Sequence, residues 1–511
     1  MKPSERDTVI IYFPDTGGHN FTPPYELLFQ YEALKSLPVK VILVDHRTND
    51  LKEILNQHHQ TTLLVVISTI IKYTSITISK QYDDGILASE YIHVNYSLPV
   101  LWTGLAPTIL DLLLSPFTDY ILKANSERAL LQLVKAFLER STFDNIENLG
   151  YKNDDKMMIQ NTVVPYDAFE HFGNFDLSVL DIRKYIHNQT FDYVATTGCI
   201  NKCSFCTVPL IYSQKCFHNA IHVVANHLST LTDKYKEIRI IHFRDDNFMA
   251  QKNFVFSLFE LLQQKDVHFL WSAQTSINVL TTYKDEELIW LHQQGCTNIS
   301  IGIESGDPYI LKKVTKSKTD INKSIQSIKK LLQASISPSL TSIISFPYNN
   351  GRDFRKTLKV LMKIKLLYPK LSLYCTVFHP IPKTEIFNEL FPSEALTIKS
   401  SDYNNWTTDK ERLILKKFEQ LYFTFCDRFF YKSLPHETGK KIRVLNILLY
   451  PFIRFRFFLG STHFLWEYNI ASKRLKAIQK EYGLPEDKES SCIGIRHLNT
   501  NYGYNVVKID K

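Results

Sequence analysis

Three cysteines stand close together in the middle of the chain with the spacing Cys-x3-Cys-x2-Cys. They are Cys199, Cys203 and Cys206, and they directly follow a stretch, 193–197, that we predict to be a strand. Three thiolates on one loop can hold an iron-sulfur cluster, although four cysteines are the usual full set of ligands. One iron would then be open to a substrate, and an open position distinguishes a reactive metal site from a structural one.

A structural zinc site is the alternative interpretation, with Cys216 or a nearby histidine as its fourth ligand. Zinc sites of this kind usually combine two paired sets of ligands, and Cys216 is too isolated to supply the second pair. The remaining cysteines, Cys296, Cys375, Cys426 and Cys492, are equally scattered, which is typical of packing roles. The spacing therefore favours an iron-sulfur cluster.

The chain that leads up to this loop begins with about 140 residues in which short apolar runs alternate with amphipathic stretches. This alternation predicts an α/β domain, residues 1–140, built as a doubly wound, Rossmann-like parallel sheet. Ligands of such sheets bind beyond the carboxyl ends of the strands, so the loops 14–24, 68–75 and 104–108 are candidate binding loops. The predicted strands are Thr8 to Phe13, Val39 to Val44, Thr62 to Ser68, Val100 to Thr103 and Asp119 to Leu122.

After a polar, weakly periodic linker at 141–187, the alternation of strands and helices starts again over residues 188–395. Six strand-helix units are too few for a complete eight-fold barrel, but they are enough for an open, partial (β/α)6 barrel with its chemistry at the strand C-termini. The predicted strands are Tyr193 to Thr197, Ile238 to Arg244, Phe269 to Ala273, Asn298 to Gly302, Leu340 to Ile344 and Ser372 to Val377.

The C-terminal region, residues 396–511, is aromatic and basic, and we predict it to be mostly helical. Within 428–466, seven lysines and arginines stand against a single acidic residue, Glu437. Two interpretations remain open for this region. Its helices cover the open side of the barrel, or they present a surface that contacts a membrane or an acidic partner.

The overall composition excludes several classes of protein. With 511 residues, 44% of them hydrophobic and 22% charged, the chain resembles a globular protein of about three domains rather than a disordered or collagen-like one. The longest uncharged stretches, 91–110 and 331–351, contain prolines that are unsuited to a membrane helix. No signal-peptide pattern is present, so we expect a cytoplasmic location. A net charge of +8 over this length is more typical of a soluble protein than of one that binds nucleic acid.

The cysteine motif, with Phe205 before its last cysteine, resembles the signature of the radical S-adenosylmethionine (SAM) enzymes. Four further segments match this family in the expected order, namely Phe243 to Phe248, Trp271 to Gln274, Gly302 to Gly306 and Ser345 to Pro347. The resemblance implies that the three cysteines hold a [4Fe-4S] cluster whose free iron binds SAM. It also implies that SAM is reductively cleaved there to a 5′-deoxyadenosyl radical.

The same resemblance implies that the ends of the barrel strands bind SAM. The ammonium group of SAM calls for carboxylates such as Asp245 or Asp246, and its ribose hydroxyls call for an acceptor such as Glu304. The alternative roles are a helix N-cap for the two aspartates and a salt bridge at the barrel rim for Glu304. The complete implied set is Phe205, Asp245, Asp246, Gln274, Glu304 and Ser305.

Residues 99–108, followed by 119–122 and Glu127, resemble the cobalamin (B12)-binding domain that precedes the barrel in one large radical SAM subfamily. The resemblance thus covers about residues 8–395. It implies that a flat corrin lies across the strand ends of the first sheet. The implied cobalamin contacts are Gly17, Gly18, His19, Ser68, Thr69, Gly104 and Pro107.

The sequence departs from the pattern of this subfamily at several positions. It lacks the Asp-x-His-x-x-Gly element that gives some cobalamin proteins a lower axial histidine, and His19 is better explained as a solvated loop residue. Thr103 and Ala124 stand where glycines are common, and Ser276 stands where an arginine is frequent. The first domain has no cysteine, which disfavours the methylthiotransferases, because those enzymes place a second cluster there.

The resemblance implies a cobalamin-dependent methyltransferase that acts on an unactivated carbon of a small-molecule substrate and receives electrons from an external flavodoxin- or ferredoxin-like donor. Two alternatives stay open. One is radical rearrangement, cyclisation or oxidation without methyl transfer, and the other is a non-catalytic scaffold with a structural metal. No residue is nominated as a general acid or base, and no nucleic-acid partner is expected.

Overall fold

Apolar strands of the N-terminal region pair into a seven-stranded sheet in the order β2-β1-β3-β4-β5-β6-β7. The first five strands in chain order pair in parallel, as expected where helices connect them. The last two pair antiparallel at one edge. The strands are β1 (Thr8–Phe13), β2 (Lys40–Asp45), β3 (Thr62–Ser68), β4 (Val100–Thr103), β5 (Tyr120–Leu122), β6 (Leu149–Lys152) and β7 (Met158–Gln160).

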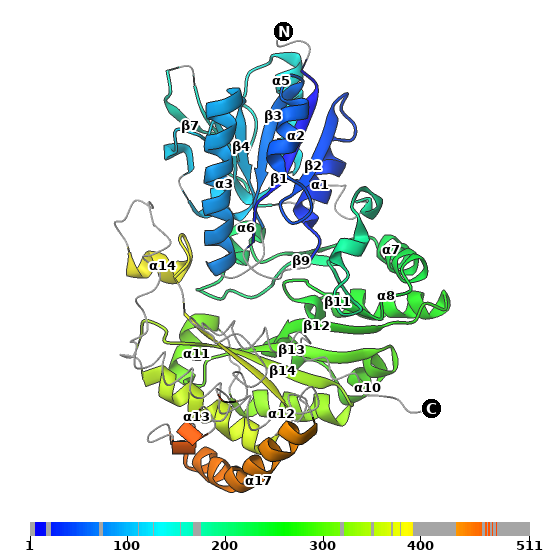
Figure 1. Ribbon diagram of the computed structural model, residues 1–511, viewed down its shortest axis with the longest axis vertical. Helices are drawn as coiled ribbons and strands as arrows, with labels where there is room; N and C mark the ends of the chain where they lie inside the picture. The colour runs from blue at the N-terminus through cyan, green and yellow to red at the C-terminus, as the bar shows by residue number, and fades with distance from the viewer. Residues whose placement is uncertain are drawn as a thin grey trace. The chain divides into compact units, whose positions relative to one another are not determined.

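The computed structural model describes residues 6–16, 22–70, 75–110, 112–125, 127–153, 155–166, 175–316, 321–348, 352–368, 371–378, 380–391 and 436–461, with 466, 467, 469, 470, 473 and 477. The chain divides into two compact units. The first consists of residues 1–275 and 380–401, and the second of 276–379 and 402–511. Figure 1 labels the elements of both units.

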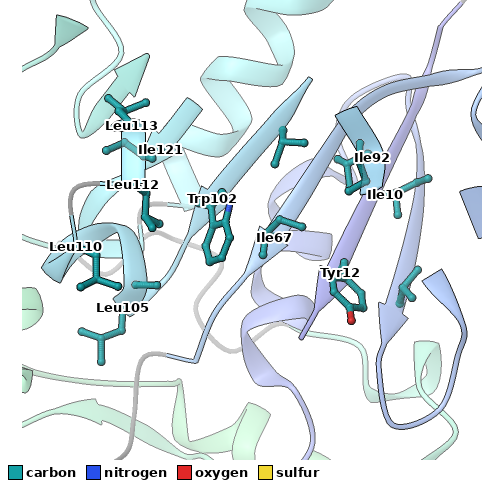
Figure 2. Packing of buried hydrophobic residues seen from close by; sticks show 14 of the residues in the cluster. Ile10, Tyr12, Ile67, Ile92, Trp102, Leu105, Leu110, Leu112, Leu113 and Ile121 are labelled. Atoms are coloured by element: carbon teal, nitrogen blue, oxygen red, sulfur yellow. The ribbon is translucent and has the colours of Figure 1, made fainter. Parts of the chain in front are cut away.

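Helices cover both faces of the first sheet, which is why its strands are apolar along their length. All seven residues of β3 are buried. On one face, Tyr12, Ile67 and Trp102 pack with residues of α2, α3 and α4 (Figure 2). On the other face, Ile11 and Val66 pack with α1 and α5. The helices are α1 (Tyr25–Leu34), α2 (Leu51–His58), α3 (Ser75–Tyr96), α4 (Leu105–Ile109) and α5 (Glu127–Glu139).

The second sheet has six strands in the order β15-β14-β13-β12-β11-β8, and it is the sheet of a partial barrel. Its strands are β8 (Thr190–Tyr193), β11 (Ile240–Phe243), β12 (Leu270–Ser276), β13 (Cys296–Glu304), β14 (Ser337–Ile344) and β15 (Ser372–Val377). The helices between these strands include α7 (Ile221–Lys234), α8 (Lys252–Gln264), α10 (Asp285–Gln293), α11 (Pro308–Thr315), α12 (Ile321–Gln333) and α13 (Arg352–Leu367).

The strands of the second sheet alternate between two kinds of surface. Phe243 and Trp271 point toward α8, where both rings pack against Phe259. Their neighbours His242 and Ser272 therefore lie on the opposite face, because successive side chains of a strand alternate. This opposite face is the inner face of a barrel and is available for ligands.

Several predicted elements differ from those observed. The predicted strand Tyr193 to Thr197 is two strands, because β8 ends at Tyr193 and the short β9 (Thr196–Gly198) pairs instead with β10 (Cys216–His218). The region predicted as a linker contains β6 and β7, which extend the first sheet beyond the five predicted strands.

The C-terminal region includes one long described helix, α17 (His436–Leu459), as its composition predicts. No helix in the described ranges is long and apolar enough to cross a membrane.

Candidate active site

The cysteine loop begins at a tight backbone turn. Gly198 is the last residue of β9, opposite Cys216 of β10. Its φ angle is +85°, and a Cβ atom placed there would collide with the carbonyl oxygen of Lys215. Only glycine suits such a position. The loop ends at α6 (Val208–Tyr212), so a rigid hairpin and a short helix hold the cysteines between them.

Cys199, Cys203 and Cys206 are all half-buried, so their sulfur atoms are shielded without being sealed from ligands. The side-chain amide of Asn247 donates to Cys199 Sγ over 3.5 Å. Burial raises the pKa of the Cys199 thiol above its usual range. Burial, together with the nearby Cys199, also raises the pKa of Cys216, to about 11.

The three thiols suit a cluster better than a single ion. A zinc ion requires its ligands to converge on one point at about 2.3 Å. Among the described residues, no three His, Cys, Asp or Glu side chains converge in that way. In a [4Fe-4S] cluster each thiolate binds a different iron, so the three sulfurs need not meet at one point. The loop therefore fits a cluster through Cys199, Cys203 and Cys206.

Two carboxylates from the end of β11 brace the cysteine loop. Asp245 is fully buried, and its carboxylate accepts the backbone N–H groups of Thr196 and Ala195. Asp246 Oδ2 accepts the N–H of Gly198 over 2.7 Å. Backbone N–H groups of a buried loop need such partners, because an unpaired one costs as much as a lost hydrogen bond. Both aspartates thus fix the backbone that carries the cysteines.

The sequence offered a helix N-cap as the alternative role of these aspartates. The N-caps of the following helices, η6 (Phe248–Ala250) and α8, are instead Asn247 and Gln251. The role of the two carboxylates toward the ammonium group of SAM stays a prediction.

Gln274 and Asn247 link the end of β12 to the segment that follows β11. Gln274 Nε2 donates to the carbonyl oxygen of Asp245 over 2.7 Å. Asn247 Oδ1 accepts from Thr275 Oγ1 over 2.9 Å, while its amide reaches Cys199. The structure thus connects Gln274, Asp245 and the first cysteine in one network. Phe205 lies in the same loop and is half-buried.

Glu304 and Ser305 belong to the second unit, at the end of β13. Burial raises the pKa of Glu304 to about 7. Its carboxylate lies over Gly302, where a Cβ atom would collide with it, so this glycine makes room for the acid. Ser305 is fully buried, lies 3.3 Å from Thr357 Oγ1 and accepts the N–H of Asp307. Of Glu304 and Ser305, it is Glu304 that has a carboxyl group able to accept hydrogen bonds from ribose hydroxyls.

The loops after β3 and β4 pack tightly against each other at the carboxyl edge of the first sheet. Thr69 Oγ1 donates to the carbonyl oxygen of Thr103 and accepts the N–H of Ala106. Gly104 has φ +95°, and a Cβ atom there would collide with the Thr69 carbonyl. Pro107 is buried in α4 next to this contact. Ala124 also has a positive φ, +57°, which explains why glycine is common at its position.

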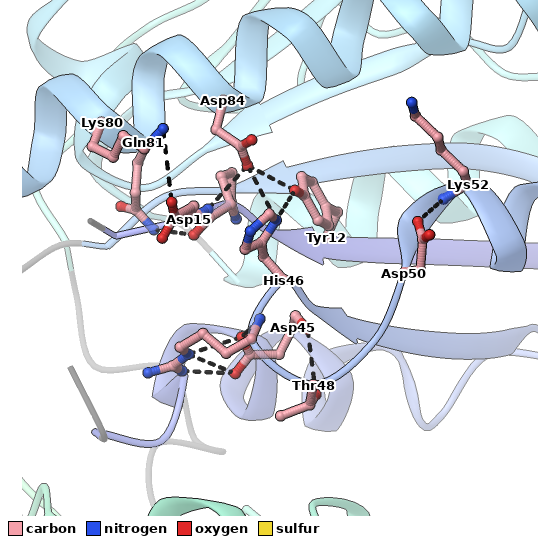
Figure 3. A network of polar contacts seen from close by, with 12 residues as sticks. Tyr12, Asp15, Asp45, His46, Thr48, Asp50, Lys52, Lys80, Gln81 and Asp84 are labelled. Atoms are coloured by element: carbon pink, nitrogen blue, oxygen red, sulfur yellow. Dashed lines mark hydrogen bonds and ion pairs between the residues drawn. The ribbon is translucent and has the colours of Figure 1, made fainter. Parts of the chain in front are cut away.

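A polar network fixes the loop after β1 (Figure 3). Asp84 of α3 accepts the Tyr12 hydroxyl over 2.7 Å and the N–H of Asp15 over 3.0 Å. Gln81 of the same helix donates to the Pro14 carbonyl and accepts the N–H of Ile70. The start of α3 thus holds two neighbouring loops of this edge. The predicted contacts Gly17, Gly18 and His19 lie outside the described residues.

Two buried polar atoms near this edge have no hydrogen-bond partner among the described residues. They are Thr16 Oγ1, in the loop after β1, and Gln30 Oε1, whose amide nitrogen donates to Ser68 Oγ over 3.0 Å. Buried polar groups are nearly always paired, so an orphaned one calls for an explanation. A cofactor with amide groups at its periphery would satisfy them, and the edge therefore fits a cobalamin.

The two sheets are joined within the first unit by hydrogen bonds to β8. Thr22 Oγ1 donates to Asp192 Oδ2 over 2.5 Å, and the Tyr25 hydroxyl donates to the Asp192 carbonyl over 2.8 Å. Tyr185 donates to Asp45 at the end of β2 over 2.8 Å. The carboxyl edge of the first sheet is thus connected to the strand that leads into the cysteine loop.

Sequence reasoning missed a polar row on the inner face of the second sheet. Asp192, His242 and Ser272 stand opposite one another on three adjacent strands. His242 Nδ1 lies 2.6 Å from Ser272 Oγ, and Arg244 lies 3.4 Å from both His242 Nε2 and Asp192. Burial lowers the pKa of His242 to about 4, so it is neutral at physiological pH. The signal in the sequence was the alternation Ile241, His242, Phe243, Arg244 within an apolar run.

Comparison with known proteins identifies the domain that contains the cysteine loop. Residues 193–361 match the model of the Radical SAM superfamily. The chain therefore contains a radical SAM domain. It is 24% identical over 355 residues to an uncharacterized methyltransferase, PH0819, of Pyrococcus horikoshii, and the match covers 67% of this chain and 73% of the relative.

Two solved structures share the architecture of this radical SAM enzyme. The methyltransferase TsrM of Kitasatospora setae, with cobalamin and a [4Fe-4S] cluster bound, has a TM-score of 0.62 at 15% identity, over 76% of this chain and 75% of TsrM. The cobalamin-dependent enzyme OxsB, with aqua-cobalamin and SAM bound, has a TM-score of 0.66 at 14% identity, over 95% of this chain and 82% of OxsB. At such identities the likeness establishes the fold alone. The predicted fold, a Rossmann-like sheet before a partial barrel, is confirmed.

Proposed function

We propose that this radical SAM enzyme is a cobalamin-dependent methyltransferase that acts on an unactivated carbon of a small molecule. The observation that carries the proposal is the connection between two candidate sites in one compact unit. Thr22 and Tyr25 bind the edge of the first sheet to Asp192, a few residues before the cysteine loop. A cofactor on that edge and a cluster on that loop would be held by one hydrogen-bonded framework. The names of PH0819 and TsrM, both methyltransferases, support the same reaction.

When bound, the cluster would supply the electron for reductive cleavage of SAM, and cobalamin would supply the methyl group for transfer to the substrate carbon. The chain's own residues bind and orient. Cys199, Cys203 and Cys206 hold the cluster, while Asp245 and Asp246 hold the loop in place. Ser68, Thr69 and Gly104 would hold the corrin at the carboxyl edge of the first sheet.

The inner face of the second sheet is where we place the polar part of the substrate. His242 and Ser272 lie there with Arg244 and Asp192, and a neutral imidazole can both donate and accept a hydrogen bond. The reaction also consumes electrons, which we assign to an external flavodoxin- or ferredoxin-like donor. Because free thiols and such clusters require a reducing compartment, we place the enzyme in the cytoplasm.

Anaerobic reconstitution with iron, sulfide and cobalamin, followed by reduction in the presence of SAM with a labelled methyl group, tests the proposal. We expect a brown protein that forms 5′-deoxyadenosine and transfers label to the extracted corrin. Deoxyadenosine without label in the corrin would support radical chemistry without methyl transfer. A colourless protein that contains zinc and cleaves no SAM would leave only the non-catalytic scaffold.

A further inference from the structure

Over the described side chains of helix α17, residues 448–459, there are two apolar faces, of which one is buried. Leu449, Ile453 and Phe457 recur at four-residue spacing and are buried at 2–5% exposure. This inward face packs against α13, beside which Figure 1 shows α17. At its end, Arg456 forms a buried ion pair with Glu467 at 2.7 Å. These contacts fix the rotation of α17 about its own axis.

The opposite face of α17 carries a row of large apolar side chains. Leu448, Phe452, Phe455 and Leu459 follow the spacing of one helical face, and each is 54–62% exposed. Phe458 extends the row and is 73% exposed. The row runs for about 16 Å along the helix at 1.5 Å per residue. Contiguous exposed apolar surface of this kind marks an interaction site, since single exposed apolar residues are ordinary but rows of them are not.

Basic side chains border this apolar row. On α13, Arg355, Lys359 and Lys363 are exposed at four-residue spacing. Lys359 lies against the end of α17, because its side-chain carbons are the nearest atoms to a Cβ placed on Gly460, at 3.0–3.4 Å. Arg454 of α17 is exposed as well. In these helices, the described acidic residue Asp353 is buried, so the described charge at the border is positive.

We propose that α17 docks on the surface of a membrane that contains anionic lipid. Phenylalanine and leucine side chains of a surface helix enter the boundary between headgroups and acyl chains, while lysines and arginines remain at the level of the phosphates. The two rows match this arrangement, with the apolar row directed away from α13 and the basic row beside it. The helix binds in the plane of the membrane surface.

Sedimentation of the reconstituted 511-residue chain with vesicles tests this proposal. We expect binding to vesicles of phosphatidylcholine with phosphatidylglycerol, and little binding to phosphatidylcholine alone. The variant Phe452→Ser/Phe455→Ser should weaken binding at least about ten-fold per side chain, because each loses the burial of an aromatic ring. The variant Arg355→Gln/Lys359→Gln/Lys363→Gln should weaken binding to anionic vesicles about 100-fold, at roughly five-fold per charge.

Leu87→Ser is the matched control, since Leu87 is an equally exposed apolar residue, at 64%, on α3 of the other unit. It should bind vesicles like the unaltered chain. Equal binding to neutral and anionic vesicles would overturn the proposal, as would full binding by the double serine variant. The row would instead mediate self-association if the unaltered chain forms a dimer and binds no vesicles, while the double serine variant is a monomer. Circular dichroism and SAM cleavage of each variant show that the fold is intact.

Discussion

The two parallel sheets of this enzyme distribute polar residues differently along their strands. In the first sheet, β1 and β3 are buried throughout, and functional polar groups begin only where the strands end, at Ser68 and Thr69. In the second sheet, Asp192 and His242 lie within the strands on one face. A sheet covered on both faces offers a ligand only its edge. A barrel sheet offers an edge and an inner face, so it can surround a substrate while the first sheet supports a cofactor from one side.

Removal of one cluster ligand should have the largest effect, and this effect should be confined to the cysteine loop. Cys203→Ala is expected to lower reductive SAM cleavage about 1,000-fold or more, because ligands that act as a unit fail together. Cobalamin binding at the first sheet should stay unchanged. Cys216→Ala is the control, and it should retain iron and activity. Iron analysis and deoxyadenosine formation measure the outcome, and normal cleavage by the Cys203 variant would refute the cluster assignment.

The two strained glycines permit a reciprocal test of the two candidate sites, the cysteine loop and the carboxyl edge of the first sheet. Gly198→Ala and Gly104→Ala each place a Cβ against a carbonyl oxygen at positive φ, so each should destabilise its loop by about 3 kcal/mol. The Gly198 variant should lose iron and keep cobalamin. The Gly104 variant should keep iron and bind cobalamin at least about ten-fold more weakly. Absorption spectra of the two reconstituted variants measure the cluster and the bound corrin. The same loss of cluster and corrin in both variants would contradict separate sites.

Glu304 gives the edge of the second sheet a pH dependence. Its pKa in the folded chain, about 7, is above its ordinary value of 4.5, so the folded state favours the protonated acid. The stability that this group contributes is complete below about pH 4.5 and is lost as the pH rises through 7. Glu304→Gln should therefore be more stable than the unaltered chain at pH 8, by up to about 3 kcal/mol, and equally stable at pH 4.5. Urea unfolding at the two pH values measures this, and a difference independent of pH would rule out the ionisation as its cause.

The smallest expected effect concerns the connection between the two sheets. Thr22→Val removes a hydroxyl that donates to the Asp192 carboxylate, which should cost about 1.5 kcal/mol of stability. Thr232→Val is the control, because the Thr232 hydroxyl donates to carbonyl oxygens of its own helix, those of Leu228 at 2.9 Å and Ser229 at 3.3 Å. Thermal unfolding should separate the two variants. Equal unfolding temperatures of the two variants would mean that this hydrogen bond contributes nothing to the stability of the first unit.

The sequence predicted best those features that depend on local pattern. The uniform apolar runs of β1, β3 and β4 predicted their boundaries, and the cysteine spacing marked a loop that lies within the matched radical SAM domain. The hairpin of β9 and β10 was missed, because Val194 and Ala195 continue the apolar run of β8 without a turn signal. β6 and β7 were missed because they are only four and three residues long and include polar residues, so their sequences have no strong period.

Features that depend on tertiary contacts could not be predicted. The sequence marks Asp245 as a polar residue at a strand end, but its partners are backbone N–H groups of Thr196 and Ala195, about 50 positions away. The exposed row on α17 is likewise invisible without knowing which face packs against α13. An aromatic helix reads as buried until its neighbour is known.

The brace on the cysteine loop has a consequence for how the enzyme matures. The carboxylates of Asp245 and Asp246 accept the N–H groups of Thr196 and Gly198, so the polypeptide itself fixes the backbone of this loop. Zinc fingers stay unfolded until they bind metal. This polypeptide, in contrast, can fold first and receive its metal centre afterwards. We therefore expect an iron-starved cell to accumulate an intact apoprotein that waits for assembly factors rather than one that is degraded.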